Sequence, residues 1–319
     1  FMLLMILLVT SGSAQSPRWV FRMDQILDNR EYFSEYAYPQ TIFGARIDGR
    51  ALFQIDSFLS VGAGLNYMYE FGGAPLDISP AVDLYVRVDR PHFSFLAGAF
   101  PRRGVIDHPL YMLTDTLGYY RPNVEGISVT LNGDWGKLQA WADWTGRVTE
   151  SRRETFLVGM DHLIRKGGFF IHPSFIMYHN AQTTHPADSV PLQDNGILSV
   201  TSGWDLSGNT PLDTLWMAVG WTASYNRFRP QPAEWANGWL VEGEAAYTIF
   251  SMKGVYYHGT PLDFAYGDPF FSAGKYGRID LAVAPFRHPA VDARLGWNLH
   301  FVPGEGIHHS QQMLITITF

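Results

Sequence analysis

Apolar and polar residues alternate with a period of two along most of this chain. In the stretch 82–89, four aliphatic residues alternate with Asp83, Tyr85, Arg87 and Asp89. The stretches 278–283 and 291–301 repeat the pattern. Because successive side chains of a β-strand point to opposite faces, each stretch predicts a strand with one apolar and one polar face. No stretch of useful length has helical periodicity.

Turn residues between the alternating stretches divide the chain into sixteen predicted strands. Many have ten or more residues, which is longer than typical soluble strands of about five or six. A strand of about 9–11 residues crosses a bilayer at a tilt. The two least regular strands are 18–24 and 252–260, and without both the number is fourteen. The predicted strands are 18–24, 41–55, 58–70, 80–89, 92–99, 126–132, 137–146, 154–164, 169–181, 196–206, 214–228, 238–250, 252–260, 276–286, 289–302 and 309–319.

The predicted connections alternate between short and mostly long. Outer-membrane barrels have this arrangement, with short turns facing the periplasm and long loops outside the cell. An even number of strands places both ends of the barrel on the short-turn rim. The long connections are 25–40, 71–79, 100–125, 147–153, 182–195, 229–237, 261–275 and 303–308.

The last strand has an apolar face formed by Met313, Ile315, Ile317 and the terminal Phe319. This ending resembles the C-terminal signal of bacterial outer-membrane β-barrels, which the barrel-insertion machinery reads. The resemblance implies an all-β fold: a porin-like, transmembrane, antiparallel up-and-down β-barrel in a Gram-negative outer membrane. It also implies the insertion machinery and outer-membrane lipid as partners.

The other end of the chain predicts export. An apolar run over residues 1–9 is followed by small residues up to Ala14, as in a secretory signal peptide. We expect an N-terminally truncated signal peptide over 1–14, cleaved after Ala14, and one barrel domain over 15–319.

Composition excludes several kinds of site and partner. Charged residues make up 17 % of the chain, against about 25 % in soluble domains, and aromatic residues make up 15 %. The absence of cysteine excludes disulfides, thiolate metal sites and a lipoprotein anchor. The net charge is −7 without a basic stripe, so nucleic acid is not an expected partner.

A sheet in lipid must close on itself, because lipid offers no hydrogen bonds to an open edge. The apolar faces then meet lipid, with aromatic residues near the strand ends, and the charged faces line a water-filled lumen. The inward set contains six cations and ten anions, which predicts a mild preference for cations. The cations are Arg46, Arg50, Arg87, Lys137, Arg278 and Arg294, and the anions are Asp48, Glu70, Asp83, Asp89, Asp143, Asp161, Glu242, Glu244, Asp280 and Asp292.

These features predict a channel for passive diffusion of small polar solutes. The longest connection, 100–125, is similar in position to the constriction loop of sixteen-stranded general porins, although their Pro-Glu-Phe-Gly-Gly sequence is absent from it. We expect it to fold into the pore, with an extracellular cap as the alternative. Its candidate filter residues are Arg102, Arg103, Asp107, Asp115, Arg121 and Glu125.

Two other functions compete with a channel. One is a barrel plugged by its loops that serves as a surface-binding or assembly component. The aromatic loop 261–275, with Phe264, Tyr266, Phe270 and Phe271, would then be a contact surface. The other is an outer-membrane hydrolase, which needs a clustered Ser/His or Asp/His set at the lipid-facing or extracellular rim.

Sequence motifs give no support to catalysis. Asp161 and His162 are adjacent on a predicted strand and therefore point to opposite faces. The fragments Asp107-His108 and His308-His309-Ser310 are as readily loop residues in water. No hydrolase or metal-binding motif occurs. We therefore expect no enzyme, cofactor or metal site, and we leave the solute and homo-oligomerisation open.

Overall fold

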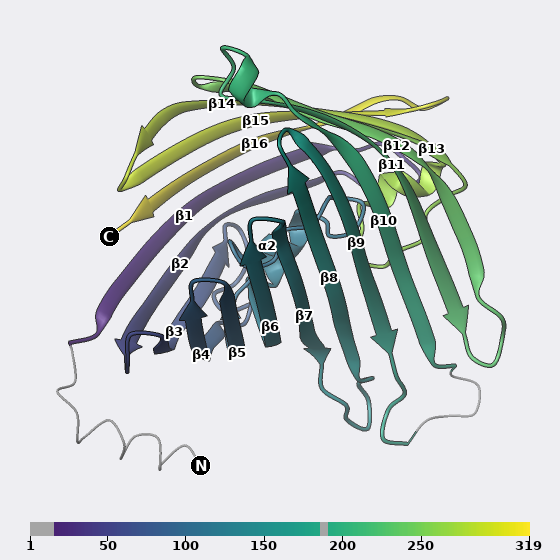
Figure 1. Cartoon of the computed structure of the whole chain (residues 1–319). Coiled ribbons are helices and arrows are strands. Elements are labelled where there is room, and N and C mark those ends of the chain that lie inside the picture. The colour runs from purple at the N-terminus through teal and green to yellow at the C-terminus, as the bar shows by residue number, and fades with distance from the viewer. Residues whose placement is uncertain (1–15, 186–190) are drawn as a thin grey trace.

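The computed structural model describes residues 16–185 and 191–319, and it is a closed barrel of sixteen antiparallel strands (Figure 1). Each strand pairs with its neighbours in the chain, and β1 pairs with β16 to close the wall. The strands are β1 Arg18–Glu31, β2 Gln40–Gln54, β3 Leu59–Glu70, β4 Ala81–Arg90, β5 Phe93–Pro101, β6 Asn123–Gly133, β7 Gly136–Gly146, β8 Thr155–Lys166, β9 Phe169–Asn180, β10 Gln193–Asp205, β11 Thr214–Phe228, β12 Glu234–Tyr247, β13 Phe250–Gly259, β14 Lys275–His288, β15 Val291–Val302 and β16 Gly306–Thr318.

The predicted fold class and the strand number of sixteen are confirmed. The largest difference is at β1, which continues to Glu31 and not to residue 24. Residues 25–31 keep the alternation and pair with both β2 and β16, so the strand has no reason to end earlier. The predicted signal peptide lies outside the described residues.

The two rims of the barrel differ in their connections. The rim that carries both ends of the barrel, called here the inner rim, has connections as short as 91–92, 134–135 and 167–168. The opposite outer rim has long connections, including 71–80, 102–122 and 260–274. In outer-membrane barrels the rim with long loops faces the outside of the cell.

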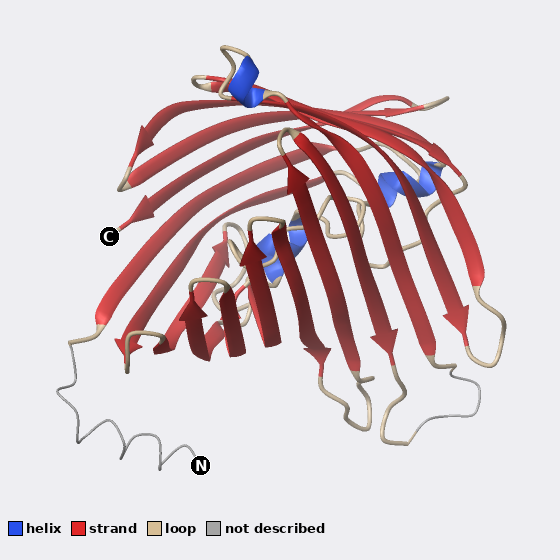
Figure 2. Cartoon of the chain, in the orientation of Figure 1, coloured by secondary structure: helices blue, strands red, loops and turns tan. Residues whose placement is uncertain are grey.

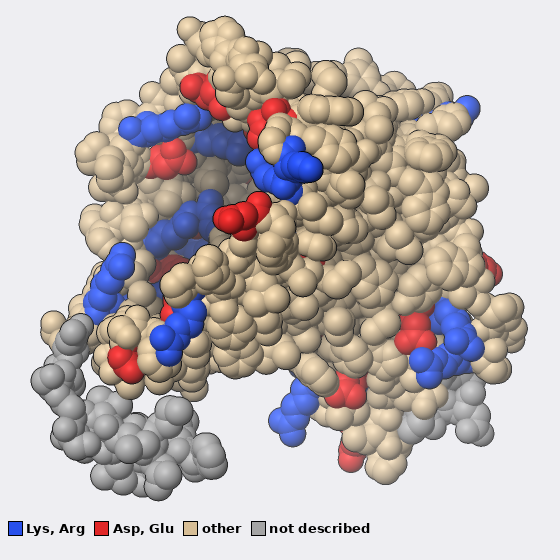
Figure 3. Space-filling view, viewed as in Figure 1, with Lys and Arg blue, Asp and Glu red and all other residues tan. Residues whose placement is uncertain are grey.

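The wall separates apolar from charged side chains. Outward residues such as Leu65, Val82 and Val219 are exposed, whereas inward residues such as Asp83 and Asp143 are buried. The outside of the wall is accordingly almost free of Lys, Arg, Asp and Glu in Figure 3, where these residues gather at the rims and in the hollow at the left. Among residues 16–185 and 191–319, no helix is long and apolar enough to cross a bilayer.

Two outer-rim loops, 102–122 and 260–274, fold into the barrel and meet inside it. They contain the helices α2 Thr116–Tyr120 and η3 Pro269–Ala273, whereas another short helix, η2 Ser207–Asn209, belongs to the inner rim (Figure 2). The amide of Thr114 donates to the carbonyl of Tyr266 at 2.8 Å, and the amide of Asp268 donates to Leu110 at 2.8 Å. We call these two loops the plug.

The plug has an apolar core that joins it to the wall. Met112, Phe270 and Phe271 are almost completely buried and belong to one cluster with wall residues on opposite sides of the lumen. The hydroxyl of Tyr111 lies 3.1 Å from that of Ser199 on β10, far around the barrel from β5 and β6. The suggestion that a plugged barrel would use loop 261–275 as a contact surface is wrong for Phe264, Phe270 and Phe271, which are buried. Burying these aromatic rings in the lumen removes a large apolar area from water.

Candidate functional site

The structure places the predicted pore-lining residues on the inward face, where most are paired. The side chain of Arg50 contacts both Asp48 and Asp83, and Arg87 lies 2.5 Å from Asp89. Pairing removes much of the desolvation cost of these charges. Their role in solute selection stays a prediction. The full predicted set is Arg46, Asp48, Arg50, Asp83, Arg87, Asp89, Asp143, Glu242, Glu244, Arg278, Asp280, Asp292 and Arg294.

Arg278 on β14 connects the wall to both loops of the plug. Its guanidinium lies 2.6 Å from Asp280 on the same strand, 3.1 Å from Asp268 and 4.0 Å from Asp115. Asp115 also pairs with Arg30 on β1 at 3.1 Å. Burial alone would raise the pKa of Asp115, but the charges of Arg30 and Arg278 outweigh it and lower that pKa. Asp115 is therefore an anion that ties loop 102–122 to β1 and β14, which are three strands apart in the wall.

The candidate filter residues do not form one ring. Arg102 is buried against Asp143, Arg103 lies 3.2 Å from Asp24, and Arg121 donates to the carbonyl of Thr145. Asp107 is exposed. The placement of Glu125 in the loop is wrong, because β6 begins at Asn123 and pairs Glu125 with Ala99, so that its side chain points outward with Ile127.

His108 is a buried, neutral contact of the plug. The indole nitrogen of Trp141 donates to its Nε2 at 3.0 Å, which requires that this nitrogen carry no proton. Burial lowers the pKa of His108 to about 4, and the nearby Asp161 opposes this shift only in part.

The lowered pKa of His108 predicts that loop 102–122 is held less firmly in the lumen at acidic pH. When the loop leaves the wall, His108 regains its ordinary pKa of about 6.5. Between about pH 6.5 and 4, the released loop therefore binds a proton that the docked loop does not. Docking of the loop in the lumen weakens as the pH falls through this range. The loss amounts to about 3 kcal/mol at the acid end. Hydrogen–deuterium exchange of residues 102–122, corrected for intrinsic rates, should rise from pH 7 to pH 4. His108→Gln, which still accepts from Trp141, should remove that rise, and an unchanged rise would contradict the assignment.

A Ser/His/Asp cluster does occur inside the lumen. Asp161 accepts from Ser174 at 2.8 Å and lies 2.6 Å from Nε2 of His172. Ser174 thus donates its proton to the carboxylate, and the imidazole nitrogen nearest to it already faces the same carboxylate. The order Ser–His–Asp that activates a serine is absent here. The closed wall also separates this cluster from lipid.

A second His/Asp pair lies on the outward, lipid-facing side of the barrel. Nδ1 of His179, near the outer end of β9, is 2.7 Å from Oδ1 of Asp194 at the start of β10. Arg229 donates to the other carboxylate oxygen, from Nε at 2.8 Å and with Nη2 at 2.7 Å. We call this pair the His179–Asp194 dyad.

The dyad has the geometry of an activated base. A carboxylate only accepts hydrogen bonds, so Nδ1 of His179 carries the proton and Nε2 keeps its free electron pair. Asp194 is itself fixed by Arg229 on one side and His179 on the other. This arrangement orients the imidazole and stabilises the cation that forms when Nε2 takes a proton.

Aromatic side chains flank the dyad along the outer rim. The rings of Trp144, Phe156 and His179 are stacked in sequence, with centroid distances of 5.0 and 4.8 Å. On the other side, Tyr225 lies 5.3 Å from the exposed Trp235. Aromatic girdles mark the headgroup level of an outer-membrane barrel, so the dyad lies where the headgroups of lipids begin.

Next to the dyad is an outward cavity of about 420 Å³, lined by residues of β9–β12 that include Arg227, Arg229 and Trp235. Arg227 and Asp194 are paired in register, and Nε of Arg227 donates to the carbonyl of Gln231 at 3.1 Å. Figure 3 shows a group of basic and acidic side chains at the outer rim on this side of the molecule, at the lower right. A cationic, half-apolar cavity facing lipid suits part of an amphiphilic molecule.

Reasoning from the sequence missed the dyad, because its residues are fifteen positions apart on strands joined by a long loop. One signal was present. His179 and Asp194 occupy positions of the lipid-facing register that are otherwise apolar, with Met177 before one and Leu198 after the other. Among the described residues, no group of three or more His, Asp or Glu side chains is placed to hold a metal ion.

Fold and site together define a porin-like outer-membrane barrel with a polar centre on its lipid-facing rim. The fold is similar to OmpT of Vibrio cholerae with loop L8 deleted (TM-score 0.58, 10 % identity, 97 % of this chain and 100 % of that chain covered). It is also similar to an anion-selective porin from Comamonas acidovorans (TM-score 0.57, 8 % identity, 95 % and 100 %). A third similar structure is Salmonella typhi OmpF in complex with daunomycin (TM-score 0.56, 11 % identity, 95 % and 97 %). These identities show the shared fold alone.

The family model for lipid A 3'-O-deacylase-type proteins matches residues 13–285, and the chain belongs to this family. No curated protein matches the chain. The expectation that this protein is not an enzyme is therefore wrong, because the family is one of enzymes. Strand pairing, and not adjacency in the sequence, brings His179 and Asp194 together, so no sequence motif marks them.

Proposed function

We propose that this protein is an outer-membrane hydrolase that removes an ester-linked acyl chain from a glycolipid of the lipid A type. The observation that carries the proposal is the His179–Asp194 dyad on the lipid-facing side of the outer rim. The substrate class is suggested by the name of the family to which the chain belongs. From the sequence, we expected an outer-membrane hydrolase to need a Ser/His or Asp/His set at the lipid-facing or extracellular rim. The dyad is an Asp/His pair at such a position.

The chemistry follows from the geometry of the dyad. Nε2 of His179 takes a proton from water while the water oxygen attacks the ester carbonyl carbon. The oxygen of the tetrahedral intermediate becomes negative, and the guanidinium of Arg227 supplies the nearby positive charge that stabilises it. His179 then returns the proton to the sugar oxygen as the carbon–oxygen bond breaks. The products are a sugar hydroxyl and a free fatty acid.

Location supports the dyad over the luminal cluster around Asp161 as the proposed site. A membrane lipid diffuses in the bilayer plane and meets the outward face of the barrel, where the dyad lies. Reaching Ser174 would require the lipid to cross a wall in which every strand is paired with two neighbours. The dyad is therefore the site that the substrate class can reach.

Purified protein in proteoliposomes tests the proposal. Incubation with lipid A that carries an ester-linked chain at position 3' should release that chain, detected by mass spectrometry as a free fatty acid and a lighter glycolipid. Lipid A already lacking this chain serves as the control and should remain unchanged. Absence of release by a correctly folded barrel would contradict the proposal.

Diffusion of small polar solutes is the second candidate function. The observation that favours it is a luminal cavity of about 420 Å³ between loop 102–122 and the wall, lined by charged wall residues that include Arg22, Asp24, Arg46 and Asp48. The cation preference expected from the inward charges remains a prediction. A channel of this kind would require a route past the plug.

A further inference from the structure

We propose that the outward face of β1, β2 and β11–β16 holds a second lipid, with a hydroxyl-rich headgroup on a polar array and one acyl chain in an adjoining groove. The inference is independent of the proposed hydrolysis. The polar array, on β16, β1 and β2, lies six strands or more from β10 in the order of the wall, whereas the far end of the groove reaches β11, next to β10. At a strand spacing of about 4.8 Å, the array is roughly 29 Å from β10 along the wall, too far for one headgroup to contact both the array and the dyad.

The array consists of Asn29, Glu31, Thr41, His309 and Gln311 at the seam of the barrel. Register pairs Asn29 with both Thr41 and Gln311, and it pairs Glu31 with His309. All five side chains share the outward face with apolar neighbours such as Met23, Phe43 and Ile307, which are exposed. They lie near the outer ends of their strands, at the level of the headgroups.

One chain of hydrogen bonds connects four of these side chains. The hydroxyl of Thr41 donates to Asn29 at 2.8 Å, and the amide nitrogen of Asn29 donates to Gln311 at 2.7 Å. The nitrogen of Gln311 lies 2.7 Å from Nδ1 of His309. The amide nitrogen of Asn29 also donates to Glu31 at 3.1 Å.

Glu31 determines which groups donate and which accept along this series of hydrogen bonds. As a carboxylate it only accepts, so the amide nitrogen of Asn29 must face it and the oxygen must face Thr41. Gln311 then presents its nitrogen to His309, whose Nδ1 accepts and whose Nε2 carries the proton. The array thus offers a donor on His309 beside acceptors on Glu31, the pattern that neighbouring sugar hydroxyls require.

The negative charge of the array disfavours a lipid with a phosphate headgroup. Its only formal charge is the carboxylate of Glu31, and it contains no Lys or Arg. Polar groups facing lipid are costly unless they are hydrogen-bonded, and they commonly mark functional sites. An uncharged, hydroxyl-rich headgroup would satisfy the remaining donors and acceptors without repelling Glu31.

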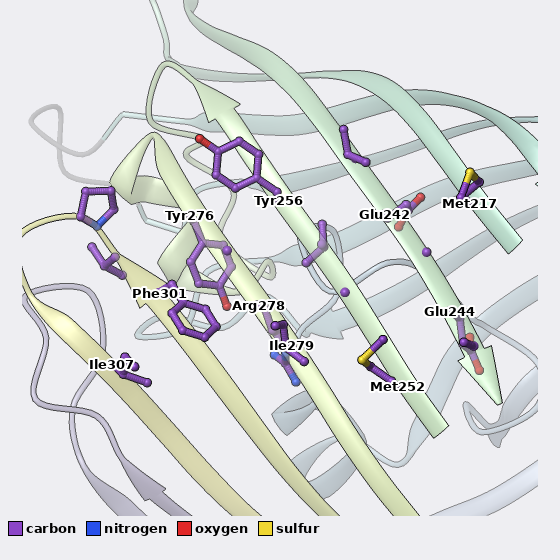
Figure 4. A pocket seen from close by; sticks show the side chains of 18 of the residues that line it. Met217, Glu242, Glu244, Met252, Tyr256, Tyr276, Arg278, Ile279, Phe301 and Ile307 are labelled. Atoms are coloured by element: carbon purple, nitrogen blue, oxygen red, sulfur yellow. The ribbon is translucent and has the colours of Figure 1, made fainter. Parts of the chain in front are cut away.

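A groove of about 930 Å³ on the same outward face begins beside the array (Figure 4). Its end beside the array is formed by Phe301 and Ile307, and Ile307 is two positions from His309 on β16. Its lining is mainly apolar and includes Met217, Met252, Tyr256 and Ile279, which Figure 4 shows on neighbouring strands. The groove therefore suits a hydrocarbon chain.

Strand register joins the array to the groove in one continuous row. From Glu31 and His309, paired residues lead through Leu299, Ile279, Gly254 and Gly243 to Met217. His309 is the fourth residue of β16 from the outer rim, and Met217 is the fourth residue of β11 from the inner rim. The row therefore runs from the headgroup level toward the inner rim along a path of roughly 24 Å, the length of five strand spacings.

Gly254 gives a direct way to block the groove. A Cβ at this position has only the carbonyl oxygen of Arg278 within 4 Å, at 3.8 Å, so a larger side chain fits and points into the groove. Gly254→Leu should fill the groove, and the pair Asn29→Leu with Gln311→Leu should remove the array. Ala63→Leu, on the outward face of β3, is the matched control.

Native mass spectrometry of delipidated protein tests the site with two probes of equal chain length, diglucosyl diacylglycerol and phosphatidylglycerol. We expect one retained glucolipid per barrel and at least tenfold weaker retention of phosphatidylglycerol. Gly254→Leu and the double variant should each lower glucolipid retention at least tenfold, whereas Ala63→Leu should not. Equal retention by all variants, equal retention of both lipids, or a dimer that only the array variants dissociate would overturn the proposal. Circular dichroism confirms that each variant is folded.

Discussion

Replacing His179 by glutamine should reduce release of the ester-linked acyl chain by about 10²–10⁴-fold, the usual contribution of a positioned general base. Glutamine keeps the size of the side chain and can still hydrogen-bond to Asp194. It has no basic nitrogen to accept a proton from water. Fatty-acid release from proteoliposomes, measured by mass spectrometry at saturating substrate, gives the comparison.

Two further variants test whether the loss of activity is specific to the dyad. Asp194→Asn should also reduce the rate strongly, because its amide can stabilise the wrong tautomer of His179 and cannot balance the imidazolium. His162→Gln is the matched control, since His162 is an outward histidine near the inner rim, beside Trp135. Full activity of His179→Gln would exclude the dyad as the catalytic centre while leaving the family assignment intact.

Replacing Arg278 by methionine should release the plug. The change leaves Asp115, Asp268 and Asp280 close together without the cation that they share. Removing one partner of a buried ion pair costs about 3–5 kcal/mol, and repulsion among the three carboxylates acts in the same direction. In a planar bilayer, the variant should show larger and more frequent conductance steps than the wild-type protein.

Arg294→Met is the control for this experiment. Arg294 points inward from β15 but is exposed, and it pairs in register with Leu314 on β16. Its replacement removes a luminal charge without touching the plug, so the conductance should stay close to wild type. Identical conductance of Arg278→Met and wild type would show that Arg278 does not hold the loops in place.

Strand alternation was sufficient to predict the wall. The pattern of Val82, Leu84 and Val86 against Asp83, Tyr85 and Arg87 identifies both the strand and the face that meets lipid, because only one arrangement hides charge from hydrocarbon. Errors were confined mainly to strand ends, as at Glu31 and Glu125, where pairing with a neighbour extends a strand beyond its most regular part.

The site could not be predicted in the same way, because strand register decides which residues meet. His179 and Asp194 face each other only in the pairing of β9 with β10, and a shift by one residue would turn one of them into the lumen. The same holds for Asn29 and Gln311, which are 282 positions apart. Alternation identifies the face of a residue but not its partner.

The plug was predicted in part. Loop 100–125 was expected in the lumen from its length and position, whereas the aromatic residues of loop 261–275 suggested a contact surface in the alternative of a plugged barrel. Phe271 packs against Tyr111 of the first loop, and Phe270 packs against Tyr276 and His300 of the wall. A loop that is buried by another loop carries no periodic pattern of its own, so its sequence alone does not indicate the outcome.

The pairing of β1 with β16 determines when the barrel can close. The amide of Phe319 donates to the carbonyl of Phe21 at 2.9 Å, so the last residue of the chain bonds with one near the start of the barrel. Until β16 exists, β1 and β15 each have an unpaired edge that can join another chain. Contacts between such distant residues form slowly. The barrel therefore cannot close until β16 has been synthesised, and a chain truncated before β16 would keep two unpaired edges.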